Sequence, residues 1–308
     1  ASTIPLYERA VDLGDAKLTH EFARMHLFGH LVRKDENYAA ELFLKTARNG
    51  HAESQVELGI LYSERQDPAD SIKWFRRASE QGHVRAQYLL SRIYLAKSPP
   101  STYPEAHRLM GLAAARGHVP AMSKLGRLLL DGHTFGLDKE AGIKWIVAAA
   151  KAGDASAQFR YGDALFYGNH VKQDYAAAVP WVTKAAEQEH PDALGLLARI
   201  YHNGFGVKKD VKRAKVLTDK AIRSGNIDLL YPIALSLTQT GRPRSLVSAY
   251  AITSVIMRYS VKRSSHHIKA RALRDQIEPQ LSAEHLARAK RKDETMYRMI
   301  KGMRAEFN

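Results

Sequence analysis

The sequence predicts an all-α fold built from repeated helical hairpins, and three observations predict it. Turn residues recur in steps of 36, 32, 35, 36, 36 and 36 residues. A large apolar residue stands eight positions before each turn, and a small residue stands nine positions after it. A fixed interval of this length is typical of repeat proteins whose unit is one helical hairpin. The turn residues are Gly14, Gly50, Gly82, Gly117, Gly153, Glu189 and Gly225.

Residues 143–168 show the unit most clearly. Apolar residues recur four to five positions apart on both sides of Gly153. This spacing fits the helical period of 3.6 and does not fit the period of two that a strand would show. Because glycine lacks a Cβ atom, Gly153 takes a positive φ at little cost and ends the first helix. The unit therefore reads as helix, tight turn, helix.

The distance of each residue from the turn predicts where the helices begin and end. We expect aspartates to cap the helices that precede the turns (B helices), because a carboxylate accepts the free N–H groups of a first turn. The expected caps are Asp35, Asp67, Asp138, Asp174 and Asp210, with Thr102 in the third repeat. The helices that follow the turns (A helices) are expected at 16–28, 52–63, 84–96, 119–131, 155–167, 191–203 and 227–239.

Three features depart from the regular repeat. Residues 3–13 carry the B-helix pattern, so the chain begins inside a unit; either a short native end caps the stack or upstream repeats are missing. The repeat that follows Gly50 is short. Pro180 lies inside a B helix, where we expect it to kink the backbone.

The repeat pattern fades beyond Ser260. Two further helices are expected at 265–278 and 282–305, with Pro279 between them. We therefore predict a helical solenoid over residues 1–260, starting within a B helix, and C-terminal capping helices over 261–308. A polar end-piece of this kind covers the last apolar face of a repeat array.

Composition narrows the possible functions. The chain has 308 residues, no cysteine and a net charge of +15. The absence of cysteine excludes disulfides, thiolate metal sites and cysteine nucleophiles. No apolar run approaches the length of about 18 residues that a membrane span needs. The positive charge favours acidic partners, namely an acidic protein, an anionic polysaccharide, a membrane surface or nucleic acid.

The histidines do not indicate catalysis. His51, His83, His118 and His190 occupy the same place just after the turn, which implies a repeated structural role. The pair His266–His267 lacks the spacing of a helical zinc site. No nucleophile stands beside a base, and no phosphate-binding or dinucleotide motif occurs. We therefore predict no enzyme activity, cofactor, metal site or small-molecule substrate.

Two stretches resemble a known family. The sequences AAEQEHPDALGLLARIYHNGFGVKKDVKRA (185–214) and ASEQGHVRAQYLLSRIY (78–94) are similar to the Sel-one-like repeat (SLR) family, whose members are related to tetratricopeptide (TPR) repeats. The resemblance covers roughly residues 3–260, and RALRDQIEPQLSAEHLARA (271–289) is similar to the piece that closes many such arrays. It implies a right-handed α-solenoid of about seven αα-hairpins with a helical C-terminal cap.

In the resembling families the A helices line the concave side of the solenoid. The positions six, ten and thirteen residues after the turn share one side of helix A, and we call them the A-helix stripe. Arginine and aromatic residues recur there, and these types dominate binding hot spots. Arginine also forms helices well, and aromatic side chains can fill space between adjacent A helices, so a purely structural role stays open. The candidate partner-binding residues are Arg24, Tyr88, Arg92, Arg127, Phe159, Asp163, Arg199 and Tyr231.

The sequence therefore predicts a non-enzymatic scaffold or adaptor that binds a protein partner with an acidic segment in the concave groove. The resemblance implies adaptors of bacterial envelope assembly, export or signalling, hence a periplasmic or envelope location, or eukaryotic quality-control adaptors. Any association with a membrane would be indirect, and the oligomeric state is left open. One alternative is an inhibitor, such as an immunity protein that neutralises a secreted toxin. Another is binding of nucleic acid or another anionic polymer by the clusters at 208–215 and 288–292.

Overall fold

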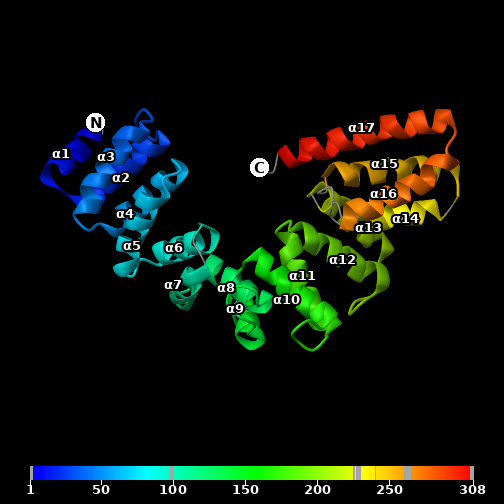
Figure 1. Ribbon diagram of the computed structural model, residues 1–308, viewed down its shortest axis with the longest axis horizontal. Coiled ribbons are helices and arrows are strands. Elements are labelled where there is room, and N and C mark those ends of the chain that lie inside the picture. Colours follow the sequence, from blue (N-terminus) through cyan, green and yellow to red (C-terminus); the bar gives the residue numbers. More distant parts are fainter. Residues whose placement is uncertain are drawn as a thin grey trace. The chain divides into compact units, whose positions relative to one another are not determined.

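The computed structural model describes residues 3–97, 100–224, 226, 230–239, 241–259 and 265–305. These residues form helices joined by turns and short loops, and no strand occurs among them (Figure 1). The all-α prediction is confirmed. The chain divides into two compact units, residues 1–152 and 153–308. No helix within the described ranges is long and apolar enough to cross a membrane.

The first unit consists of hairpins in which consecutive helices pack side by side. The predicted A helices match α2, α4, α6 and α8, with the starts as predicted and the ends within one residue. The helices are α1 (Ile4–Leu13), α2 (Ala16–Phe28), α3 (Glu36–Arg48), α4 (Ala52–Glu64), α5 (Pro68–Glu80), α6 (Val84–Lys97), the short 3-10 helix η1 (Pro100–Thr102), α7 (Tyr103–Ala115), α8 (Val119–Asp131) and α9 (Lys139–Lys151).

The second unit continues the pattern and adds the C-terminal helices. The helices are α10 (Ala155–Tyr167), α11 (Tyr175–Glu187), α12 (Pro191–Asn203), α13 (Val211–Arg223), α14 (Leu230–Thr238), α15 (Pro243–Tyr259), α16 (Ser265–Ile277), the 3-10 helix η3 (Glu278–Gln280) and α17 (Ala283–Ala305). Helix α11 extends on both sides of Pro180, so the proline does not end the helix. Residues 227–229, the expected start of the last A helix, and the predicted turn at Gly225 lie outside the described residues.

The turns have the predicted backbone. Gly50 has φ of 90° and Gly153 has φ of 96°, and Glu189 takes the same left-handed conformation with φ of 62°. The aspartate caps are also confirmed; Asp35, for example, accepts from the backbone N–H groups of Asn37 and Tyr38 at 3.1 and 2.9 Å. The prediction for Thr102 is wrong, because its hydroxyl donates to the Tyr94 carbonyl oxygen (3.1 Å) and makes no cap hydrogen bond.

The close approach of the two helices in a hairpin depends on the small residue, as predicted, but the facing residue was placed one position too early. A Cβ atom added to Gly59 would lie 2.6 Å from the ring of Phe75, not of Trp74. A Cβ atom on Gly162 would lie 2.6 Å from Cγ2 of Val182. The residue seven positions before the turn therefore meets the glycine.

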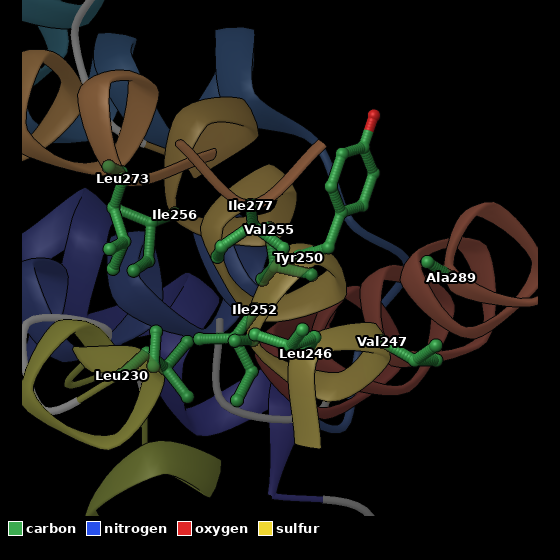
Figure 2. Close-up of a cluster of buried hydrophobic side chains, with 13 residues drawn as sticks. Leu230, Leu246, Val247, Tyr250, Ile252, Val255, Ile256, Leu273, Ile277 and Ala289 are labelled. Atoms are coloured by element: carbon green, nitrogen blue, oxygen red, sulfur yellow. The ribbon is translucent and has the colours of Figure 1, made fainter. Parts of the chain in front are cut away.

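The C-terminal helices share a core with the last repeat. Leu230 of α14, Ile252 of α15 and Ile277 of α16 belong to one buried cluster, which Ala289 of α17 completes. Figure 2 shows the side chains of this cluster, which are aliphatic apart from Tyr250. Helices α16 and α17 thus cover the last hairpin. The predicted boundary at residue 260 lies outside the described residues and stays a prediction.

Candidate functional site

The arginines of the A-helix stripe in the first unit differ in their intramolecular partners. The guanidinium of Arg24 lies over the Phe28 ring at 5.8 Å, and that of Arg92 lies over the Tyr88 ring at 5.6 Å. Arg127 instead forms an ion pair with Asp131 at 2.8 Å. The ion pairs found among the described residues do not include Arg92. Arg92 therefore keeps its positive charge available to an acidic ligand, whereas the charge of Arg127 is compensated within its own helix.

The aromatic residues of the stripe connect neighbouring repeats. The ring centroid of Tyr88 lies 4.7 Å from that of His118, and Phe159 stacks on His190 at 4.9 Å. Tyr231 packs against the C-terminal core cluster. All three are half-buried. Packing between successive A helices therefore accounts for Tyr88 and Phe159, which is the structural alternative that the sequence left open.

The repeated histidines cap the A helices. Nδ1 of His83, His118 and His190 accepts the backbone N–H three residues later, at 3.3, 3.2 and 3.4 Å, and His51 does the same at 3.3 Å. Only a neutral imidazole can accept at this atom. Burial lowers the pKa of His83, His118 and His190. Their repeated structural role is thereby identified, and within the described ranges no group of three or more potential ligands could hold a metal ion.

A hollow of about 570 Å³ opens on the stripe of the first unit. We call it the α4–α6 hollow, because α4, α5 and α6 form its walls. It contains the stripe residues Ile60, Ser63, Arg92 and Leu95, and Lys124 reaches it from α8. The remaining lining residues are Glu64, Pro68, Ser71, Phe75, Leu89, Ile93 and Ala96.

Comparison with the second unit explains why this space is open. Phe166 follows its turn by thirteen residues, as Ser63 follows Gly50, and Tyr175 begins its B helix, as Pro68 does. In the second unit Phe166, Tyr175 and Phe205 contact one another, with ring centroids 4.9 to 5.5 Å apart. Two of these rings, those of Phe166 and Tyr175, therefore stand where the first unit has a serine and a proline. The missing ring volume leaves room for a side chain from another molecule.

The charges around the hollow are unequally distributed. Arg92 and Lys124 bring positive charge, and Glu64 is the single acidic residue in the lining. Apolar walls from Ile60 and Phe75 favour a hydrophobic side chain inside. A carboxylate next to that side chain would meet the guanidinium of Arg92, which can bind it through two hydrogen bonds. The sequence identified Arg92 as a candidate but not the hollow. The hollow could have been predicted from Ser63 and Pro68, which stand where the second unit has aromatic residues.

The candidates of the second unit are tied to their own neighbours. Arg199 donates to the Tyr167 hydroxyl at 2.8 Å, and its guanidinium lies over the Phe166 ring at 5.5 Å. Asp163 is half-buried, and burial raises its pKa. Arg199 therefore links α12 to α10. The stripe residues fall into two sets, one on each unit.

Comparison with known proteins supports the repeat architecture. A family model described as the Sel1 repeat matches residues 22–51, 52–83, 84–118, 119–154, 155–190 and 191–226. The fold is similar to the crystal structure of c5321, a protective antigen of uropathogenic Escherichia coli with an SLR fold (TM-score 0.60, 24% identity, 94% of this chain and 54% of that one). It is also similar to a Sel1 repeat protein from Oxalobacter formigenes (TM-score 0.59, 23% identity, 68% and 85%).

Two relatives show higher identity over shorter stretches. An F-box protein of Arabidopsis thaliana is 34% identical over 101 residues, which are 33% of this chain and 28% of that protein. Chitin synthase regulatory factor 3 of Schizosaccharomyces pombe is 31% identical over 121 residues, which are 37% of this chain and 13% of that protein. The matched stretches thus span less than a third of each relative.

Proposed function

Because the chain belongs to the Sel1 repeat family, whose members generally act through protein–protein interaction, we propose that it is a non-enzymatic scaffold that binds a protein partner. The partner contacts the A-helix stripe of the first unit. One apolar side chain of the partner enters the α4–α6 hollow, and an adjacent acidic residue pairs with Arg92. The acidic partner segment expected from the sequence would thus bind beside the α4–α6 hollow.

The observation that carries the proposal is the contrast between the two units. In the second unit the rings of Phe166, Tyr175 and Phe205 contact one another and occupy this space. Where Ser63 and Pro68 stand instead, about 570 Å³ stays open beside a guanidinium without a carboxylate partner among the described residues. Apolar pockets with a few convergent polar groups are typical binding sites.

Filling the hollow tests the proposal. Ser63→Phe restores one ring of the second unit's arrangement, and Ser63→Ala is the matched control that leaves the space open. We expect partners captured by the unmodified protein and by Ser63→Ala, identified by mass spectrometry, to be lost from Ser63→Phe. Circular dichroism checks that both variants keep their helical content. Equal capture by both variants would show that the partner binds elsewhere.

Each alternative function that the sequence left open has its own test. An inhibitor would abolish the activity of an enzyme on forming a 1:1 complex. Nucleic-acid binding through residues 208–215 would weaken steeply with salt and equally for all sequences. The envelope or periplasmic location stays a prediction, which fractionation of the source cells would test.

A further inference from the structure

The second unit contains a groove of about 470 Å³ between α15, the last B helix, and the capping helix α17, and no residue of the A-helix stripe is among its described lining residues. We call it the α15–α17 groove. Its lining residues are Arg244, Val247 and Ser248 from α15, and His285, Arg288, Arg291, Lys292 and Thr295 from α17.

The lining follows the helical period. On α17 the residues His285, Arg288, Lys292 and Thr295 are spaced by three or four positions, so they form one stripe along the helix. With a rise of about 1.5 Å per residue, this stripe is roughly 15 Å long. Arg244 and Ser248 stand one helical turn apart on the opposite wall. The groove therefore suits an extended ligand rather than a single small ion.

Its positive charge is not compensated from within the described residues. Among the described residues, the lining contains three arginines and one lysine and no carboxylate. Two carboxylates of α17, Asp293 and Glu294, serve another contact, because each pairs with Arg258 at 2.9 Å, and Glu284 is not among the groove's lining residues. The ion pairs found in the described part of the chain include none of the groove's cations. Closely spaced cations without carboxylate partners repel one another, so an anionic ligand would be bound favourably.

The polar groups of the groove are partly ordered. Lys292 donates from Nζ to the Ser248 hydroxyl at 2.8 Å, which links the two walls. Val247 is buried below them and connects the groove floor to the C-terminal core. Packed helices therefore form the groove and hold the backbone of its positively charged residues in place.

We propose that the α15–α17 groove binds an extended acidic segment of a protein. In an extended chain alternate side chains point the same way at about 6.6 Å, close to the step of roughly 5 to 6 Å between successive α17 stripe residues. Two carboxylates at alternate positions can thus meet the neighbouring cations Arg288 and Lys292. Single-stranded nucleic acid binding relies on large aromatic rings for base stacking, and the described groove lining contains no phenylalanine, tyrosine or tryptophan.

A labelled peptide with glutamate at every second position is the probe, and its fluorescence anisotropy with the full chain is the measurement. The test variant is Arg288→Glu with Arg291→Glu. The control is Lys269→Glu with Lys290→Glu, on exposed residues outside the groove lining. Each double variant lowers the net charge by four, from +15 to +11, so both change the overall field equally.

We expect the groove variant to bind the peptide about tenfold or more weakly, and the control to lose no more than about twofold, at physiological salt. If the reversed variant loses helical signal, Arg288→Gln with Arg291→Gln replaces it. Equal losses in test and control, or no binding by the unmodified chain, would overturn the proposal. A single-stranded oligonucleotide of equal charge that binds more tightly and depends on the same arginines would assign the groove to nucleic acid instead.

Discussion

Replacing Glu189 by glycine should stabilise the second unit. Glu189 holds the turn between α11 and α12 with φ of 62°, where the equivalent turns have glycine. A left-handed backbone costs a residue with a Cβ atom roughly 1 to 2 kcal/mol. Glycine recovers this cost but gives back about 0.5 to 1 kcal/mol through the greater entropy of the unfolded chain.

The side chain of Glu189 offsets part of the backbone cost. It pairs with Lys220 at 2.9 Å, but both side chains are about half exposed (47% and 46%). Solvent screening limits such a pair to a few tenths of a kcal/mol. The balance predicts that Glu189→Gly raises the free energy of unfolding by about 0.5 kcal/mol.

Urea denaturation followed by circular dichroism measures this effect. Glu189→Gln is the matched control, because it removes the ion pair and keeps the backbone strain. It should lower the midpoint slightly while Glu189→Gly raises it. A midpoint for Glu189→Gly below that of the unmodified protein would refute the assignment of strain to this turn.

Three further predictions concern the fold. Burial lowers the pKa of His83, His118 and His190, so below pH 6.5 these residues bind more protons in the unfolded chain than in the folded one. The melting temperature should therefore fall between pH 7 and 5.5, and a constant value would contradict neutral caps. Gly162→Ala should destabilise by about 1 to 3 kcal/mol in urea denaturation, because its Cβ atom would lie 2.6 Å from Val182, whereas a shift within error would mean that α11 moves freely. Truncation after residue 224 should cause aggregation or early melting in light scattering, because it removes the covering helices, and an unchanged profile would make them an appendage.

The helices were readable from sequence because their determinants are local. A turn residue that takes positive φ and an aspartate cap such as Asp35 act on neighbouring backbone groups, so their spacing predicts helix ends directly. Packing partners are less local. The repeat period alone predicted that Trp74, rather than Phe75, faces Gly59. Only the backbone positions of α4 and α5 show which side chain meets Gly59.

The candidate sites were only partly predictable for the same reason. The stripe placed Arg92 correctly on the surface, but its lack of an ion pair and the compensation of Arg127 by Asp131 depend on side-chain geometry. The α4–α6 hollow follows from a comparison between distant repeats. The basic run near Arg288 was visible, whereas the contribution of Arg244 from α15 requires the tertiary structure.

Calorimetry with the natural partner tests the central claim most directly, using Arg92→Glu and Arg127→Glu as separate variants. The two arginines occupy the same stripe position in successive repeats, but only Arg92 lines the α4–α6 hollow. We predict that Arg92→Glu weakens binding by about 2 kcal/mol or more and that Arg127→Glu has a much smaller effect, because Arg127 already pairs with Asp131 at 2.8 Å. Unmodified affinity in Arg92→Glu, with a large loss on reversing Lys208 and Lys209, would contradict the account and move the binding surface to the loop edge.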